Sequence, residues 1–264
     1  MIQLVCIDVD GTLVGSTGTV LPEVWAAAER ALARGVRLAI CSGRPAFGTT
    51  LEYAERLDPR GWHIFQNGAS VVRLPDGLSR SARLSREIVA WLIEDARRRG
   101  RLLELYTDTE YAVESTSPRA RAHAGLLGVP FAPRAFASLT GDIVRAQWLM
   151  SHDEAEQLRT ESYPELEISP SVSPVMPDTV FVNITPAGVD KASAVRTVAA
   201  AYGAPLDRVM LVGDGRNDAA AMREVGFPVA MGNAVPQVLA VARHTVADVD
   251  AGGLAEALDL ALAA

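Results

Sequence analysis

The sequence predicts an α/β protein in which a doubly wound parallel-sheet core is interrupted by an inserted α+β cap. At 264 residues the chain is longer than the ~100–200 residues of one ordinary domain. Residues 1–80 and 187–264 alternate short apolar runs with helical patterns, an order typical of a parallel sheet. Residues 81–186 instead contain half-polar runs joined by short turns. We therefore expect the core at 1–80 and 187–264 and the cap at 81–186.

The core strands are apolar throughout rather than alternating, so each is expected to be buried on both faces of one sheet. In the first half, strands are predicted at LVCID (4–8), VRLAIC (36–41) and HIFQNGA (63–69). One helix is predicted at 22–35, ending at Gly35, and a second follows the strand at 36–41 and extends to about Leu57. The second half follows the same order. It has predicted helices at about 191–202, 219–226, 234–242 and from Gly253, and strands at 208–213, 228–232 and near Val246.

The predicted cap has a different pattern. A helix at 85–100 precedes two half-polar strands, 102–108 and 110–115, whose short connection predicts an antiparallel hairpin. The other predicted cap elements are helices near 118–127 and 153–162 and strands at 143–150, 166–172 and 179–185.

Charge and composition narrow the classes of function. Thirty-two acidic against 25 basic residues give a net charge of −7 at pH 7, which argues against a nucleic-acid or membrane-surface binder. No apolar run reaches the ~18 residues of a membrane span, and the N-terminus lacks the basic segment of a signal peptide, so we expect a cytoplasmic protein. Cys6 and Cys41 lie in apolar runs and are expected to be buried thiols.

Four short polar motifs fall at the carboxyl ends of predicted core strands or at nearby helix starts, where open α/β sheets bind ligands. The first is Asp8-Val9-Asp10-Gly11-Thr12. Its two carboxylates can share a cation, and one of them can attack an electrophile. A calcium-binding loop is disfavoured, because such a loop follows a helix and places its glycine later.

The second and third motifs suit an anion. Ser42-Gly43-Arg44 offers a hydroxyl and a close backbone approach to a phosphate oxygen, although an ordinary turn and helix cap would use the same residues. Lys191 is the one lysine among 25 basic residues and stands at a predicted helix start. Either the site needs a compact ammonium there, or the lysine has survived by chance on a solvated helix end.

The fourth motif is GDGRND, residues 213–218, directly after a buried strand. Asp214 stands where a second carboxylate for a metal is needed, and Asn217 and Asp218 follow one helical turn later. Asp218 as a plain N-cap of the next helix is the alternative.

Together these motifs resemble the signatures of the haloacid dehalogenase superfamily in their order: DVDGT, the serine of CSGRP, Lys191 and GDGRND. The insertion, with NGA at 67–69, VNITPAGVDKASAV at 182–195 and MGNA at 231–234, resembles the Cof-type branch (subfamily IIB), which carries a C2-type α/β cap on a Rossmann-like core. That branch often has a small apolar residue and threonine where Cys41 and Ser42 stand. Ser42 keeps the hydroxyl.

The resemblance implies a mechanism. Asp8 would attack phosphorus and form an aspartyl-phosphate, while Asp10 would protonate the leaving oxygen and later deprotonate water. Mg²⁺ would be held by the carboxylate of Asp8, the backbone carbonyl of Asp10 and the carboxylate of Asp214, with Asn217 and Asp218 orienting the metal and its waters. Ser42 and Lys191 would hold the transferring phosphoryl oxygens. The expected phosphate-binding residues are Gly11, Ser42, Gly43, Arg44, Lys191 and Asn217.

The implied function is a Mg²⁺-dependent phosphohydrolase of small phosphorylated metabolites, with sugar phosphates as the expected class. A phosphomutase of the phosphomannomutase type is disfavoured because those enzymes usually carry a longer glycine-rich fourth motif. A binding protein that kept the fold without the chemistry is expected to lose at least one of Asp8, Asp10, Lys191 and Asp214, and all four are present. Substrate choice is expected to depend on the cap.

Overall fold

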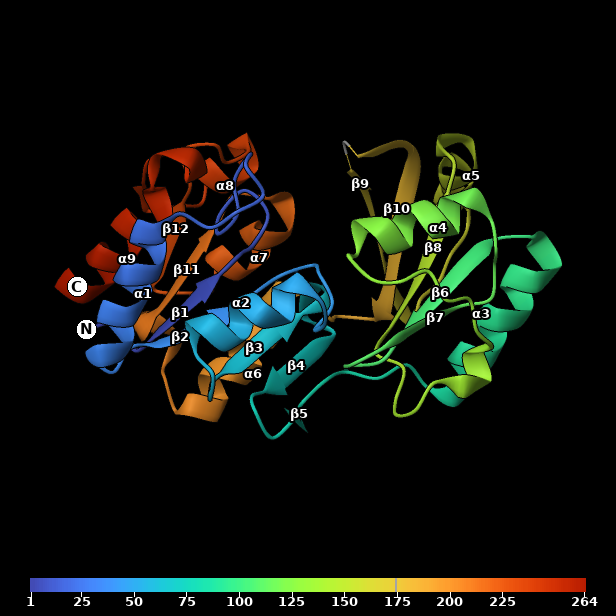
Figure 1. The fold of residues 1–264 in the computed structure, drawn as a ribbon, viewed down its shortest axis with the longest axis horizontal. Coiled ribbons are helices and arrows are strands. Elements are labelled where there is room, and N and C mark those ends of the chain that lie inside the picture. The colour runs from blue at the N-terminus through green and yellow to red at the C-terminus, as the bar shows by residue number, and fades with distance from the viewer. Residues whose placement is uncertain (174) are drawn as a thin grey trace. The chain divides into compact units, whose positions relative to one another are not determined.

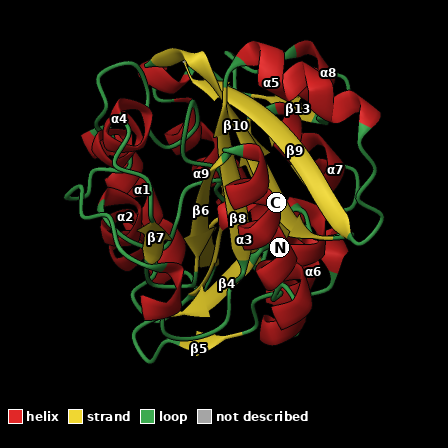
Figure 2. Ribbon diagram, turned by 90° about the vertical axis from the view of Figure 1, so that its right-hand side faces the viewer, coloured by secondary structure: helices red, strands yellow, loops and turns green. Residues whose placement is uncertain are grey.

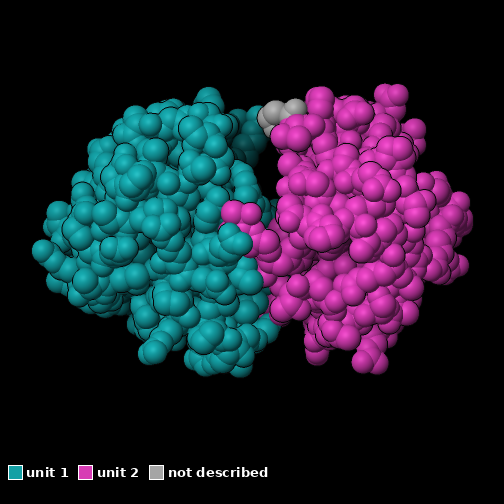
Figure 3. Space-filling model, viewed as in Figure 1, with its two compact units in different colours: residues 1–44, 50–80, 190–264 teal, residues 45–49, 81–189 magenta. Residues whose placement is uncertain are grey.

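The protein is described from a computed structural model that places residues 1–173 and 175–264. The chain divides into two compact units, drawn in separate colours in Figure 3. Unit 1 comprises residues 1–44, 50–80 and 190–264, and unit 2 comprises residues 45–49 and 81–189. The predicted class, an α/β chain with a parallel core sheet and a separate antiparallel sheet, is confirmed.

Unit 1 is built on a five-stranded parallel sheet (Figure 1). β1 and β11 are apolar and buried along their whole length, whereas the two residues of β13 are exposed. The strand order is β13-β12-β11-β1-β2, and every neighbouring pair is parallel. The strands are β1 (Leu4–Ile7), β2 (Arg37–Ile40), β11 (Val209–Gly213), β12 (Phe227–Ala230) and β13 (His244–Thr245). The strand order changes direction at β1, since the chain leaves it for β2 and later returns to its other side at β11. A crevice forms at such a switch point, at the carboxyl ends of the strands.

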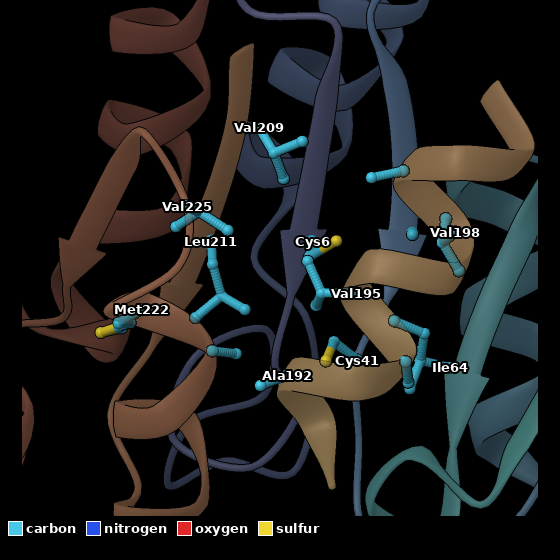
Figure 4. Close-up of a cluster of buried hydrophobic side chains, with 14 of the residues drawn as sticks. Cys6, Cys41, Ile64, Ala192, Val195, Val198, Val209, Leu211, Met222 and Val225 are labelled. Carbon is cyan, nitrogen blue, oxygen red and sulfur yellow. The ribbon is translucent and has the colours of Figure 1, made fainter. Parts of the chain in front are cut away.

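Helices pack against this sheet. α1 (Pro22–Ala33) and α9 (Gly253–Ala263) contact each other, and α6 (Lys191–Tyr202) contacts α7 (Ala219–Met222). Figure 4 shows Cys6 beside side chains of α6, including Val195, in the buried cluster between sheet and helix. The remaining helices of this unit are α2 (Thr49–Leu57), whose first residue belongs to unit 2, and α8 (Pro236–Leu239). α7 and α8 are both shorter than the helices expected at 219–226 and 234–242.

The third predicted strand needs a correction. β3 (Trp62–Phe65) ends before the expected residue 69 and pairs with β4 (Ser70–Arg73) in an antiparallel sheet completed by β5 (Leu78–Ser79). A parallel bridge between Cys41 and Ile64 links β3 to the segment that follows β2. The strand stops because the next three residues form a turn with positive φ, which reverses the chain into β4.

Unit 2 is an antiparallel sheet in the order β7-β6-β8-β10-β9, of which β9 and β10 are the long strands in Figure 2. One face packs Leu103, Trp148 and Val182 against Leu92 of α3 in an apolar cluster. The strands are β6 (Leu102–Tyr106), β7 (Tyr111–Val113), β8 (Arg145–Met150), β9 (Leu166–Ser173) and β10 (Met176–Pro186). The helices are α3 (Arg86–Arg99), α4 (Pro118–Leu126) and α5 (His152–Gln157). The predicted hairpin at 102–115 is confirmed.

Among the residues that the structure places, none of the helices is both long and apolar enough to cross a membrane.

Candidate active site

The predicted site residues all lie in unit 1, around the switch point of the parallel sheet. Asp8 directly follows β1, and Asp214 directly follows the neighbouring β11. Ser42 lies two residues beyond the end of β2, the other neighbour of β1. Lys191 is the first residue of α6. Because parallel strands end at the same sheet edge, segments from four distant parts of the chain are brought together there.

Lys191 joins two of these segments. Its Nζ lies 2.6 Å from Oδ1 of Asp8 and 2.6 Å from Oδ1 of Asp218. The lysine is 1% exposed, so the interpretation as a survivor on a solvated helix end is wrong. Burial on its own would lower the pKa of Lys191, but Asp218 and Asp8 raise it above its ordinary value. The ammonium is therefore charged, and two of its three N–H bonds point to carboxylates.

Asp8 is 7% exposed and lies in an environment that opposes its charge. Burial raises the pKa of Asp8 well above its usual range, Lys191 lowers it, and the carboxylates of Asp218 and Asp214 raise it further. Lys191 thus stabilises the ionised form, which is the form that can act as a nucleophile.

Asp218 is fully buried and uses both carboxylate oxygens within the protein. Oδ1 accepts from Lys191, and Oδ2 accepts from the backbone N–H groups of Asp214 at 3.2 Å and Gly215 at 2.9 Å. The side chain therefore closes the loop after β11 and orients the lysine. This differs from the alternative of a plain helix N-cap, since no side-chain cap bond is made to α7.

Asp214 is held from the other side by the first motif. Thr12 Oγ1 donates to Asp214 Oδ1 at 3.0 Å. Burial raises the pKa of Asp214 to about 6, against the effect of the Thr12 hydrogen bond and with a contribution from Asp218. Gly11 has φ of 80°, and a Cβ at that position would overlap Asp214 Oδ2. Gly11 is thus needed for the close approach of these two loops.

The donor set fits a divalent cation. Carboxylate oxygens of Asp8, Asp214 and Asp218 lie within 4.8 Å of one another. Three carboxylates and one ammonium leave a charge of −2 in a largely buried cluster, which is unfavourable unless compensated. Hard oxygen ligands are those that Mg²⁺ prefers. Since Asp218 already uses both oxygens, Asp8 and Asp214 are the carboxylates whose Oδ2 atoms can serve as ligands.

Asp10 is not one of the three clustered carboxylates. Its side chain is 64% exposed and forms a two-pronged ion pair with Arg44, whose Nε lies 2.9 Å from Oδ2 and whose Nη2 lies 2.5 Å from Oδ1. Arg44 was expected among the phosphate-binding residues, and the structure instead places its guanidinium on Asp10. The carboxylate remains accessible, as a general acid and base must be.

The Ser42-Gly43-Arg44 turn offers the predicted hydroxyl. Ser42 Oγ accepts from the backbone N–H of Arg44 at 3.1 Å, so its own O–H is the bond that can be donated to an oxygen. Asn217, also expected at the phosphate, donates from Nδ2 to Oδ1 of Asn67 at 2.9 Å.

Two contacts come from residues to which the sequence assigned no role. Asn67 belongs to the NGA segment and touches Asn217, as described above. Asn233, in MGNA, donates from Nδ2 to the carbonyl of Gly11 at 2.8 Å and accepts from the backbone N–H of Val249 at 3.0 Å. Both residues lie in segments that carry the resemblance to the Cof-type branch, and this resemblance is the sequence signal that singles them out.

Comparison with known proteins agrees with this geometry. A family model described as haloacid dehalogenase-like hydrolase matches residues 5–258. The chain belongs to the haloacid dehalogenase-like hydrolases. The predicted membership of this superfamily and of its Cof-type branch is thereby confirmed, and so is the prediction of a hydrolytic enzyme of the phosphatase type.

Three relatives illustrate the similarity. YxeH of Bacillus subtilis, provisionally named a phosphatase, is 28% identical and the match covers 98% of this chain and 97% of that protein. YcsE of the same organism, named a 5-amino-6-(5-phospho-D-ribitylamino)uracil phosphatase, is 25% identical with 88% and 85% covered. The solved structure of BT1666 from Bacteroides thetaiotaomicron, described among phosphatases of the superfamily, superposes with a TM-score of 0.82 at 26% identity, covering 100% of this chain and 96% of that one.

Proposed function

We propose that this haloacid dehalogenase-like hydrolase is a Mg²⁺-dependent phosphatase of small phosphorylated metabolites, sugar phosphates among them, and that it works through a phosphorylated Asp8. The observation that carries the proposal is the buried Asp8 carboxylate with Lys191 2.6 Å from one oxygen and Asp214 and Asp218 beside it. A carboxylate at the edge of a binding crevice, with an ammonium beside it that favours its ionised form, can act as a nucleophile.

In the first step, an oxygen of Asp8 forms a bond to phosphorus while the bond from phosphorus to the ester oxygen breaks. Asp10 gives its proton to the departing oxygen. Mg²⁺ held by Asp8, Asp214 and the backbone carbonyl of Asp10 would offset the repulsion between the carboxylates and a phosphate dianion. In the second step Asp10 removes a proton from water, the water oxygen attacks phosphorus, and Asp8 is released with inorganic phosphate.

Lys191 and Ser42 are proposed to bind the phosphoryl oxygens. The third N–H bond of the Lys191 ammonium and the O–H bond of Ser42 can each be donated to such an oxygen. The Asp218 carboxylate is proposed to act at one remove, since it orients Lys191 and the loop that carries Asp214.

The substrate class rests on similarity. YcsE is named for a substrate that carries a phosphate on a ribityl chain, a reduced sugar. We propose a comparable phosphate monoester for this chain, with unit 2 as the cap that selects it. A phosphomutase and a non-catalytic binding protein are the alternatives.

The test is a screen of sugar phosphates, sugar-alcohol phosphates and other metabolite monoesters with Mg²⁺, in which released phosphate is measured. We expect release that stops in EDTA, returns with Mg²⁺, and is absent from an Asp8→Asn variant of unchanged melting temperature. A matched control is Asp259→Asn, on the exposed ion pair with Arg30, which is expected to leave the rate unchanged. Isomerised phosphate esters without release of phosphate would favour the mutase, and release by Asp8→Asn at the wild-type rate would refute the mechanism.

A further inference from the structure

The turn after β3 carries the NGA segment, Asn67 to Ala69, to which the proposed mechanism gives no role. Gln66 and Asn67 have φ of 54° and 55°, and they are the only residues other than glycine with positive φ among those the structure describes. Gly68 follows at 99°. Left-handed backbone is unfavourable for residues that have a Cβ, so two in succession persist only where the surroundings hold them.

Backbone hydrogen bonds hold this turn against the second motif. The N–H of Asn67 donates to the carbonyl of Ser42 at 2.9 Å, and the N–H of Gln66 donates to the carbonyl of Arg44 at 2.9 Å. The strained turn therefore holds the Ser42–Arg44 backbone in its position.

The side chain of Asn67 reaches the fourth motif. Its Oδ1 accepts from Asn217 Nδ2 at 2.9 Å. Its amide also lies against Gly43, since a Cβ on that glycine would stand 3.1 Å from Oδ1 and 3.2 Å from Nδ2. One amide group thus contacts both Gly43 and Asn217, which belong to two different motifs of the proposed phosphate site.

The same turn also borders the third motif. A Cβ at Gly68 would overlap the backbone carbonyl of Asp190, the N-cap residue of the helix that begins at Lys191. Three of the four chemical motifs therefore meet the Gln66–Gly68 turn.

We propose that Asn67 is a positioning residue for the phosphate site, and that its strained backbone and side-chain amide fix the Ser42–Arg44 turn and the Asn217 side chain relative to each other. Asparagine suits the position because it tolerates left-handed φ better than most residues and also supplies the amide. The inference rests on the proposed function, because it takes these motifs to bind a phosphoryl group.

A pair of variants separates positioning from stability. Asn67→Gly and Asn67→Ala both remove the amide, but glycine relieves the left-handed strain and alanine retains it. Both are expected to raise KM, and the inhibition constant of inorganic phosphate, by about three- to tenfold, with a smaller change in kcat. The melting temperature is expected to fall for Asn67→Ala only. Wild-type KM in Asn67→Gly, or a KM defect confined to the less stable alanine variant, would overturn the inference.

Asn217→Ala and the double variant Asn67→Gly/Asn217→Ala test whether Asn67 acts through the Asn217 side chain. If Asn67 acts in part through Asn217, the double variant raises KM by less than the product of the two single effects. A KM that rises by the full product would show that Asn67 does not act through Asn217, and the proposed link between them would be overturned.

A binding measurement keeps this inference apart from the proposed function. Inorganic phosphate with Mg²⁺ is expected to raise the melting temperature of the wild type, and to raise that of Asn67→Gly less. If the wild type releases no phosphate from any ester but shows this difference, the proposed function fails and the inference stands. Equal stabilisation of the two proteins, or none of the wild type, would overturn the inference.

Discussion

Lys191 Nζ and Asp8 Oδ1 lie 2.6 Å apart although the two residues are separated by 183 positions in the chain, and both side chains are almost completely buried. Asp8 follows a strand of the parallel sheet, and Lys191 begins a helix on the far side of the insertion. The contact therefore forms only when the two halves of the core have joined. Any change in the size or shape of the cationic side chain at position 191 therefore affects the proposed nucleophile, Asp8, directly.

Lys191→Arg tests whether the compact ammonium is required. A planar guanidinium retains the charge but cannot occupy a buried point between Asp8 and Asp218 without displacing one of them. We expect phosphate release to fall by about 100-fold or more, with a loss of stability of about 1–3 kcal/mol from overpacking.

The reverse exchange on the surface is the control for Lys191→Arg. Arg30→Lys alters an ion pair with Asp259 in which both side chains are more than half exposed, so stability is expected to stay within ~0.5 kcal/mol of wild type. Phosphate-release rates and urea unfolding measure both variants. Unchanged turnover in Lys191→Arg would show that charge alone suffices.

The motifs could be predicted from the sequence because parallel strands end at one edge of a sheet. Asp8 and Asp214 each follow a continuous apolar run, and β1 and β11 are neighbours in the sheet. Lys191 could be singled out as the one lysine of the chain. These are local signals, and the fold class turns them into spatial ones.

Other features depend on contacts that no local pattern encodes. The ion pair of Arg44 with Asp10 joins loops 34 positions apart, and either side chain alone would suit a phosphate site. The end of β3 differs in this respect, because Asn67-Gly68 is a turn-forming pair that locally marks where Trp62–Phe65 stops, although the expected strand ran through it to residue 69. Asn67 acquires its role from Ser42 and Asn217, so its own neighbours in sequence do not reveal it.

Gly11→Ala tests the close approach of the first and fourth motifs. Gly11 has φ of 80°, and an added Cβ would overlap Asp214 Oδ2. Gly35 is the matched control, with φ of 82° and nothing within 4 Å of an added Cβ. Both alanine variants are expected to lose about 1–2 kcal/mol of stability from left-handed strain. Only Gly11→Ala is expected to need about tenfold more Mg²⁺ for half-maximal phosphate release, because Asp214 must move. Equal Mg²⁺ requirements would remove Asp214 from the proposed ligand set.

Because His63 is buried, we expect the stability of the fold to depend on pH through this residue, separately from any effect of the active site. The ring is buried; its Nδ1 accepts from the N–H of Ile40 at 3.1 Å, and its Nε2 donates to the carbonyl of Asp58 at 2.9 Å. Burial lowers the pKa of His63 from 6.5 to about 4, against smaller contributions from Asp58. The unfolded chain therefore takes up a proton at higher pH than the folded chain. Stability from this group is complete above about pH 6.5 and is lost as pH falls toward 4, by about 3 kcal/mol.

His63→Asn measures this contribution, since the amide keeps an acceptor for Ile40 and does not titrate. The free energy of unfolding is measured by urea titration from pH 7 to pH 4 for both proteins. The wild type is expected to lose about 3 kcal/mol more than the variant over this range. Parallel curves would mean that His63 is not the group responsible.

Asp10→Asn separates the general acid from the nucleophile. The Asp10 carboxylate is accessible and held by Arg44, so the amide can replace it with little change in shape. A general acid matters most for a poor leaving group. The variant is therefore expected to slow hydrolysis of an alkyl phosphate by about 10²–10⁴-fold, and cleavage of p-nitrophenyl phosphate in the first step far less, because nitrophenolate departs without a proton.

The aryl ester also allows the second step, hydrolysis of the phosphorylated enzyme, to be observed. Asp10 is also the group proposed to take a proton from water, and an amide cannot accept it, so the phosphorylated enzyme should accumulate. Rapid mixing is expected to give a burst of nitrophenol, approaching one per active site, followed by a slow steady rate. Asp8→Asn is the control and is expected to give neither burst nor steady rate. If alkyl and aryl esters slow equally and no burst is seen, Asp10 acts by holding Arg44 and the Gly11 backbone in place rather than by moving protons.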